Sequence, residues 1–208
     1  ARKPATVRRY VSSIATLHRA AGADSPTRSE FVRLALRRMA RAAGTRQEQV
    51  RALNRSDVDR MLAAAKNGLG DLRDKALLAV GYDSMARRSE LVGIDVADVR
   101  RADDGSGTVT IKRSKTDQEG RGSVRYLAPD TMRYLTAWVS AAGIAEGALF
   151  RRVRRGGVLG HRLEAGTVAR AFRGMAERAG IDPAGVSGHS LRVGCAQDQL
   201  AAGVELPS

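Results

Sequence analysis

Two arginines, a lysine and a histidine lie at positions whose local sequences could handle a phosphodiester. His189 and Arg192 are three residues apart, so a helix would place both on one face. Arg87 is at an expected helix start, and Lys115 is in a polar segment between two expected strands. Two guanidinium groups and an imidazole can hold the non-bridging oxygens of a phosphate and stabilise its transition state without a metal. A lysine on a loop can protonate the leaving oxygen.

Each of these residues has an ordinary structural interpretation when it is taken alone. An isolated arginine such as Arg87 is more often a surface residue than a catalytic one. A helix histidine such as His189 is more often hydrogen-bonded than a general base. Lys112 competes with Lys115 for the role of general acid, although Lys112 continues the strand pattern and Lys115 lies beyond it. The prediction of a phosphate site therefore depends on these residues occurring together.

The net charge of the chain favours nucleic acid as its partner. The 208 residues include 36 Lys and Arg against 22 Asp and Glu, a formal net charge of +14. The lysines are few and stand at positions 3, 66, 75, 112 and 115. Arginine, which supplies the other cations, binds phosphate through a planar, bidentate fork. A compositional bias would explain arginine in place of lysine but not the excess of positive charge, so we expect nucleic-acid binding.

The composition also excludes several classes of protein. The single cysteine, Cys195, excludes a disulfide framework and a multi-cysteine zinc site. The three histidines are scattered and no glycine-rich nucleotide loop is present, so neither a metal nor a small-molecule cofactor is predicted. Without a signal peptide or a long apolar run, we expect no membrane association. The expected location is therefore the cytosol, or the nucleus in a eukaryote.

Two helices are predicted in the first part of the chain. Residues 6–20 have apolar side chains at the three-and-four spacing of an amphipathic helix. Thr27-Arg28-Ser29-Glu30 matches a capping box and predicts a second helix to about Ala43. The arginines of this second helix recur at about every fourth position: Arg33, Arg37, Arg38 and Arg41. Because no acidic residue beyond Glu30 alternates with them, the pattern favours a face that meets phosphate over an ordinary solvated face.

The rest of the chain is predicted to be helical with one small sheet. Residues 44–54 lack strong periodicity and are typical of a linker, and Ser56 is predicted to cap the next helix. Helices are expected at about 57–67, 71–83, from near Met85, 129–141, 165–179 and 188–202, and strands at 108–111 and 123–127. The predicted fold class is mainly α with a small antiparallel β-sheet, an α+β fold in two lobes.

In this order, the singled-out residues resemble the motifs of the tyrosine recombinase (phage integrase) family. Arg87-Arg88-Ser89-Glu90-Leu91 is similar to the family's Arg-x-Ser/Ala-Glu-Leu box. Lys115 matches its hairpin lysine, and His189 with Arg192 matches its His-x-x-Arg box. The resemblance extends over almost the whole chain, and residues 187–194 are its most specific stretch.

The resemblance implies a site-specific DNA recombinase that forms a C-shaped clamp on duplex DNA and acts as a tetramer on paired sites. Arg87 and Arg192 would hold the scissile phosphate, and His189 would assist proton transfer. Lys115 would protonate the departing 5′-hydroxyl, and Glu90 would order the site around Arg87. Further DNA-binding residues implied by the resemblance are Arg9, Arg37, Arg38, Arg41, Arg152, Arg154 and Arg155. Contacts to phosphate would position the protein more than select a sequence.

The same resemblance implies a division into domains. Residues 1–48 would form the C-terminal part of a helical core-binding (SAM-like) DNA-binding domain, 49–55 a linker, and 56–208 a catalytic domain truncated before its nucleophile. The family cleaves DNA through a tyrosine beyond the second arginine, which forms a 3′-phosphotyrosine intermediate. The tyrosines of this chain all precede His189: Tyr10, Tyr82, Tyr126 and Tyr134. We therefore expect the nucleophile beyond Ser208, and no DNA cleavage by this chain alone.

Two other functions stay open on the sequence. One is a non-catalytic DNA-binding protein that kept the recombinase fold and lost the tyrosine. The other is an unrelated basic helical protein that binds RNA, which the ordered set of motifs disfavours. Sequence beyond Ser208 would separate the first alternative from the enzyme, because a tyrosine pattern there favours cleavage.

Overall fold

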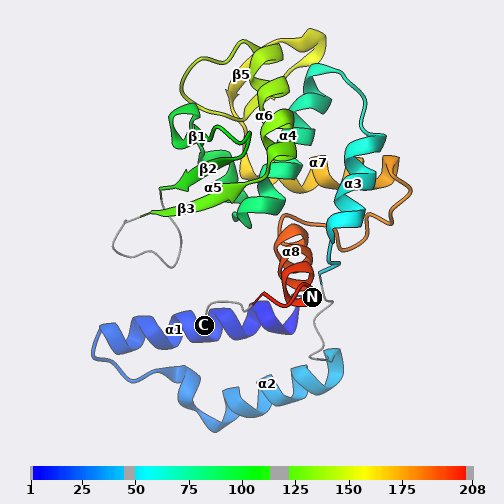
Figure 1. The fold of residues 1–208 in the computed structure, drawn as a ribbon. Helices are drawn as coiled ribbons and strands as arrows, with labels where there is room; N and C mark the ends of the chain where they lie inside the picture. Colours follow the sequence, from blue (N-terminus) through cyan, green and yellow to red (C-terminus); the bar gives the residue numbers. More distant parts are fainter. Residues whose placement is uncertain (1, 45–49, 113–121, 205–208) are drawn as a thin grey trace. The chain divides into compact units, whose positions relative to one another are not determined.

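The computed structural model describes residues 2–44, 50–112 and 122–204, which belong to two compact units (Figure 1). Unit 1 comprises Ala1–Glu48 and unit 2 comprises Gln49–Ser208. The fold class is confirmed: both units are mainly helical, and unit 2 adds small antiparallel sheets. In the described part of the chain, no helix is long and apolar enough to cross a membrane. In the same part, no three His, Cys, Asp or Glu side chains gather as a metal site.

Unit 1 consists of α1 (Pro4–Ala20), the short 3-10 helix η1 (Pro26–Arg28) and α2 (Glu30–Ala43). The predicted start of the second helix was placed two residues too early. Thr27 lies inside η1, and its hydroxyl pairs with that of Ser25 at 2.8 Å. Ser29 is the residue that caps α2, because its hydroxyl accepts a hydrogen bond from the Val32 N–H at 3.4 Å.

Unit 1 has no enclosed core among its described residues. Neither α1 nor α2 contains a buried residue, although both have an apolar face. Phe31 is 81% exposed and Leu17 is 69% exposed. Two helices bury too little surface to enclose a core by themselves. The side chains of α2 therefore stay available to solvent or to a ligand.

Unit 2 contains the remaining elements in chain order. Its helices are α3 (Arg55–Ala64), α4 (Leu69–Ser84), α5 (Arg88–Gly93), α6 (Pro129–Ala142), α7 (Ala165–Arg178) and α8 (Ser190–Ala201), with 3-10 turns η2 (Val96–Asp98) and η3 (Arg155–Gly157). Its strands are β1 (Val99–Arg101), β2 (Gly107–Ile111), β3 (Ser123–Leu127), β4 (Arg151–Val153) and β5 (Leu159–Arg162). One antiparallel sheet has the order β1-β2-β3, and β4 pairs with β5. The sequence did not predict β1, β4 and β5, which are only three or four residues long.

The core of unit 2 is built around α4, whose residues 76–82 are all buried and so cover every side of the helix. Nine of its residues are buried, and α6 lies beside it with β3 close by (Figure 1). Helices that are apolar all round belong in the centre of a core rather than at its surface. Trp138 of α6 is fully buried, and its indole N–H donates to the carbonyl of Leu149 at 2.9 Å. A rigid core therefore lies behind the C-terminal end of α4, where α5 begins.

Residues 50–54, which the sequence suggested as part of a linker, pack onto unit 2. The Leu53 side chain is fully buried, and its N–H donates to the Ser190 carbonyl at 3.1 Å. The predicted cap at Ser56 is wrong, because α3 starts at Arg55. Asn54 caps this helix instead, accepting a hydrogen bond from the Asp57 N–H at 2.9 Å. An amide one position before the helix satisfies the free N–H groups of its first turn.

Candidate active site

Arg87, His189 and Arg192 line one cavity of about 570 Å³ in unit 2, although the first is far from the others in sequence. Arg88 and Ser89 at the start of α5 form part of the wall, and the first turn of α7 contributes Ala165 and Gly166. No tyrosine is among the residues that line this cavity. The structure therefore brings together three of the residues that the sequence singled out.

Glu90 fixes Arg87 through both its backbone and its side chain. Arg87 is the N-cap of α5, and its N–H donates to Glu90 Oε2 at 2.8 Å. The Arg87 Nη1 donates to the other carboxylate oxygen, Oε1, at 2.7 Å. The Glu90 side chain is only 8% exposed, whereas that of Arg87 is 35% exposed. The buried carboxylate thus holds the guanidinium of Arg87 in a fixed orientation at the wall of the cavity.

A strained backbone carbonyl positions Arg192. Its Nη1 donates to the Met85 carbonyl at 2.5 Å, and Met85 directly follows α4. Met85 has φ 50°, and among the described residues it is the one non-glycine residue with positive φ. This conformation costs roughly 1–2 kcal/mol for a residue with a side chain. The strain is consistent with a functional position, because it turns a carbonyl toward the guanidinium. Sequence patterns gave no signal for it.

His189 is at the start of α8, in a turn held by two serines. The His189 N–H donates to Ser187 Oγ at 3.2 Å, and the Ser187 N–H donates to Ser190 Oγ at 2.9 Å. His189 itself is exposed toward the cavity, whereas Ser190 is fully buried. Gly188 lies against the Arg88 side chain so closely that a Cβ would be 2.1 Å from Arg88 Cγ. The glycine therefore lets the start of α5 approach the turn that carries His189.

Gly194 holds the helix of Arg192 against the segment before α3. A Cβ at this position would be 1.8 Å from the Leu53 carbonyl oxygen and 2.8 Å from the Asn54 nitrogen. Both obstacles are backbone atoms, so a side-chain rotation cannot relieve the overlap. The close approach also allows the hydrogen bond from Leu53 to Ser190. Arg192 is thereby placed on a helix whose distance from its neighbour is fixed.

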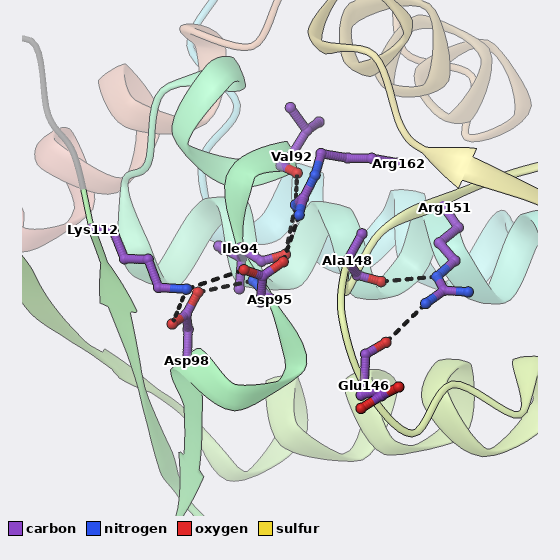
Figure 2. Close-up of polar contacts among 9 residues, drawn as sticks. All are labelled: Val92, Ile94, Asp95, Asp98, Lys112, Glu146, Ala148, Arg151 and Arg162. Carbon is purple, nitrogen blue, oxygen red and sulfur yellow. Dashed lines mark hydrogen bonds and ion pairs between the residues drawn. The ribbon is translucent and has the colours of Figure 1, made fainter.

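Of the two candidate lysines, Lys112 is committed to an ion cluster (Figure 2). Its Nζ is 3.0 Å from Asp95 Oδ2 and 2.9 Å from Asp98 Oδ1. Arg162 Nη2 pairs with the second oxygen of Asp95 at 2.5 Å. Hydrogen bonding to Asp98 and then to Asp95 raises the pKa of Lys112 above its usual value. A tightly held proton suits a general acid poorly. Lys115 lies outside the described residues.

The arginines predicted to bind DNA from unit 1 are exposed. Arg37, Arg38 and Arg41 line a concave surface of α2 with Phe31, enclosing about 560 Å³. No acidic side chain among the described residues forms an ion pair with these three arginines. Arg33, on the same helix, is instead paired with Glu30. Arg9 of α1 is also exposed, and its guanidinium carbon is 5.8 Å from the centre of the Tyr10 ring.

The arginines predicted to bind DNA from the second lobe lie in and after β4, and all three are exposed: Arg152, Arg154 and Arg155. The preceding Arg151 has a structural role instead. Its Nε donates to the Ala148 carbonyl at 3.2 Å and its Nη2 to the Glu146 carbonyl at 2.8 Å (Figure 2). The β4–β5 hairpin therefore presents three exposed arginines that form no ion pair with any acid in the described part of the chain.

Sequence reasoning missed one further arginine near the site. Arg125 of β3 lines a smaller cavity of about 130 Å³ together with Arg87, Glu90 and Arg192. The signal was present in the sequence, because Arg125 stands at an inward position of a predicted strand, between Ser123 and Leu127. An inward charged residue breaks the usual alternation and indicates a functional position.

The chain matches the model of the phage integrase family over residues 51–208. It is 31% identical to recombinase Cre of Escherichia phage P1, over 97% of this chain and 64% of that protein. It is 33% identical to an integrase/recombinase XerD homologue of Selenomonas ruminantium, over 93% of this chain and 60% of that protein. The chain thus spans less than two thirds of the length of each of these relatives.

Solved structures share the fold. The XerA recombinase matches with a TM-score of 0.60 and 22% identity, over 98% of this chain and 70% of that one. The XerH site-specific recombinase bound to its difH substrate, in a pre-cleavage complex, matches with a TM-score of 0.59 and 14% identity, over 83% of this chain and 53% of that one. The architecture expected from the motifs is therefore confirmed.

Proposed function

The chain belongs to the phage integrase family of tyrosine recombinases, and from that premise we propose that it binds duplex DNA and is the phosphate-activating part of a site-specific recombinase. The observation that carries this proposal is the meeting of Arg87, His189 and Arg192 at one cavity of unit 2. By the same resemblance, residues 56–208 act as the catalytic domain and residues 1–48 as part of a DNA-binding domain. The proposed place of action is the cytoplasm, on the nucleoid.

The two arginines are suited to bind one phosphate from two sides. Glu90 orients Arg87, and the Met85 carbonyl orients Arg192. Both guanidinium groups are therefore in position before DNA binds. Guanidinium groups fixed before the reaction stabilise the extra charge of a five-coordinate phosphorus more than they stabilise the ground state. His189 is at the cavity edge, where it can move a proton to or from the reacting oxygens.

In the proposed reaction, a tyrosine oxygen attacks the phosphorus and forms a 3′-phosphotyrosine bond while the phosphorus–5′-oxygen bond breaks. The tyrosine loses its proton, with His189 assisting, and the leaving 5′-oxygen takes a proton from Lys115. The reverse attack by a 5′-hydroxyl restores the phosphodiester, so no cofactor or energy source is consumed. A tetramer on paired sites would allow strands from two DNA molecules to exchange.

None of the four tyrosines in this chain is suited to be the nucleophile. None lines the cavity, and Tyr82 is buried with its hydroxyl donating to Asp198. Burial raises the pKa of Tyr82 far above its usual value, and hydrogen bonding to Asp198 adds to the effect. We therefore propose that these 208 residues alone bind DNA without forming a covalent adduct.

A nicked suicide duplex tests the function directly. Cleavage near the nick releases a short strand and traps the covalent complex, which a denaturing gel resolves. We expect an adduct with the protein that carries the family's tyrosine, and none with the 208-residue chain. Binding without any adduct in either case would favour a non-catalytic DNA-binding protein. A covalent adduct with the 208-residue chain would overturn the assignment of the nucleophile.

The salt dependence of DNA binding tests the partner. If some six to ten arginines displace counterions from phosphates, the slope of log K against log salt is roughly −5 to −9. A flat response, or a preference for RNA over duplex DNA, would contradict the proposal.

Lys115→Ala tests the general acid. The variant should slow cleavage of an ordinary substrate, and a bridging 5′-thiol, which leaves without a proton, should restore most of the rate. Lys112→Ala is the matched control, because the Lys112 ammonium is held by Asp95 and Asp98. If the 5′-thiol substrate restores the rate of Lys112→Ala and not that of Lys115→Ala, Lys112 is the general acid in place of Lys115.

A further inference from the structure

A second, smaller cavity adjoins the two arginines of the candidate site. It encloses about 130 Å³, and its walls include Arg87, Arg192, Glu90 and Ser123, together with Arg125. One water molecule occupies about 30 Å³ in the liquid. The cavity therefore has room for several water molecules or for a phosphate-sized group.

The register of the sheet explains how Arg125 reaches this cavity. Arg125 pairs directly with Val109 of β2, and residues that pair directly project on the same side of a sheet. Val109 is fully buried, so Arg125 is on the face that packs toward the core. Its neighbours Val124 and Tyr126 are 64% and 59% exposed on the opposite face. Arg125 nevertheless stays exposed, because the core opens into the cavity at this point.

Among the described residues that line this cavity, cationic side chains outnumber acidic ones. Arg87, Arg125 and Arg192 bring three guanidinium groups, and Glu90 is the one acidic residue among the lining residues. Both oxygens of Glu90 already accept hydrogen bonds from Arg87. Arg192 donates to the neutral Met85 carbonyl, and no ion pair joins Arg125 to any acid in the described part of the chain. An anion bound in this space would reduce the Coulomb repulsion among the three cations.

We propose that Arg125 is a third phosphate-binding arginine, which donates to the same DNA phosphate that Arg87 and Arg192 hold. This proposal rests on the proposed function and adds a residue to its site. Arg87 and Arg192 approach the phosphate from α5 and α8, whereas Arg125 approaches from β3. A third cation would stabilise the negative charge that builds on the phosphate during cleavage.

Single-turnover cleavage by a longer chain that carries the family's tyrosine tests this assignment. Arg125→Ala should slow the step on saturated DNA by roughly ten- to a hundredfold, the usual contribution of a hydrogen bond to a charged group. Arg125→Lys should lose part of that rate, because an ammonium keeps the charge without the planar fork. Arg100→Ala is the matched control, since Arg100 pairs with Thr108 and lies on the outward face of the same sheet.

A neutral substrate separates a contact with this phosphate from a contact elsewhere. Replacing one non-bridging oxygen of the scissile phosphate by a methyl group removes its charge. If Arg125 binds that charge, the rate defect of Arg125→Ala should shrink on the methylphosphonate. An equal defect on both substrates, or a rate like that of Arg100→Ala, would overturn the assignment. A wild-type protein that forms no covalent adduct would instead overturn the proposed function itself.

Inorganic sulfate provides a second readout with the 208-residue chain alone. Sulfate should raise the unfolding temperature of the wild-type chain and of Arg100→Ala, and this gain should be smaller for Arg125→Ala. An equal gain in Arg125→Ala would count against a role for this arginine in anion binding. This measurement needs neither DNA nor a nucleophile, so it does not depend on recombination.

Discussion

Arginines serve two regions of this molecule in opposite settings. In unit 2, Arg87 and Arg192 are each held by an acceptor from the protein and supported by a buried core. In unit 1, Arg37 and Arg41 lie on a helix without a buried residue and without an acidic partner among the described residues. The first setting fixes a guanidinium before a ligand binds, whereas the second leaves it exposed, as we propose for arginines that contact a DNA backbone. Under the proposed function, fixed geometry serves the chemical step and exposed charge serves DNA affinity.

The largest expected effect is on cleavage. Arg87→Ala or Arg192→Ala, in the protein with its tyrosine, should each reduce the cleavage rate by about 10²–10³-fold, because one fixed donor to a developing charge contributes about 3–4 kcal/mol. DNA affinity should change little, since each contacts one phosphate among many. Single-turnover rates and a binding titration separate the two quantities. A loss of DNA affinity as large as the loss of cleavage rate would contradict the proposed difference between the arginines of unit 2 and those of unit 1.

The next largest effect is on the stability of unit 2. Gly194→Ala should destabilise unit 2 by about 3 kcal/mol, at the upper end for overpacking, because the new Cβ meets the Leu53 backbone. Gly70→Ala is the matched control, because it is in α4 with no atom within 4 Å of its Cβ position. It should be neutral or stabilising by about 0.5–1 kcal/mol. Urea unfolding measures both, and equal stability of the two variants would contradict the rigid contact.

A smaller effect is expected for the exposed arginines of α2. Arg37→Ala combined with Arg41→Ala should weaken DNA binding and reduce the magnitude of the salt slope by about 2, close to 0.9 for each phosphate contact. The cleavage rate on saturated complexes should change much less than the affinity. Arg33→Ala is the control, because Arg33 is already paired with Glu30. An unchanged slope in the double variant would remove α2 from the DNA-binding surface.

The smallest effect is a change in the pH dependence of stability. Hydrogen bonds from Arg162 and then Lys112 lower the pKa of Asp95, so its ionised form stabilises the fold above the ordinary pKa of 3.8. That contribution is lost as the pH falls through the lowered pKa. Asp95→Asn should therefore reduce the urea midpoint at pH about 6, and the difference from wild type should narrow as the pH falls below the ordinary pKa of 3.8. Asp103 is an exposed acid without an ion pair among the described residues. Asp103→Asn should therefore have the urea midpoint of the wild type over the same pH range.

The sequence predicted the helices of unit 2 well because their apolar residues repeat at helical spacing over several turns. α7 was expected at 165–179 and is Ala165–Arg178, and α6 was expected at 129–141 and is Pro129–Ala142. The strands β4 and β5 were not predicted, because they are only three and four residues long and their sequences do not alternate in polarity. Their pairing depends on the tertiary structure around them.

The candidate site was predictable in its residue types but not in its geometry. The motifs singled out Arg87, His189 and Arg192, which the fold brings to one cavity. The acceptor for Arg192 could not be predicted, because the carbonyl of Met85 points to it only through an unusual backbone conformation. The position of Arg125 depends on strand register, which needs the pairing with β2 to be known.

The contact at Gly194 explains why residues 187–194 include a glycine that takes no part in the chemistry. Two positions after Arg192, the chain has a glycine because a carbonyl of another segment occupies the place of a side chain. A search for proteins built on the same contact should therefore require glycine there and reject alanine, even where His-x-x-Arg is intact. Chains that keep the two basic residues but carry a larger residue at that place would need a different path for the segment before α3.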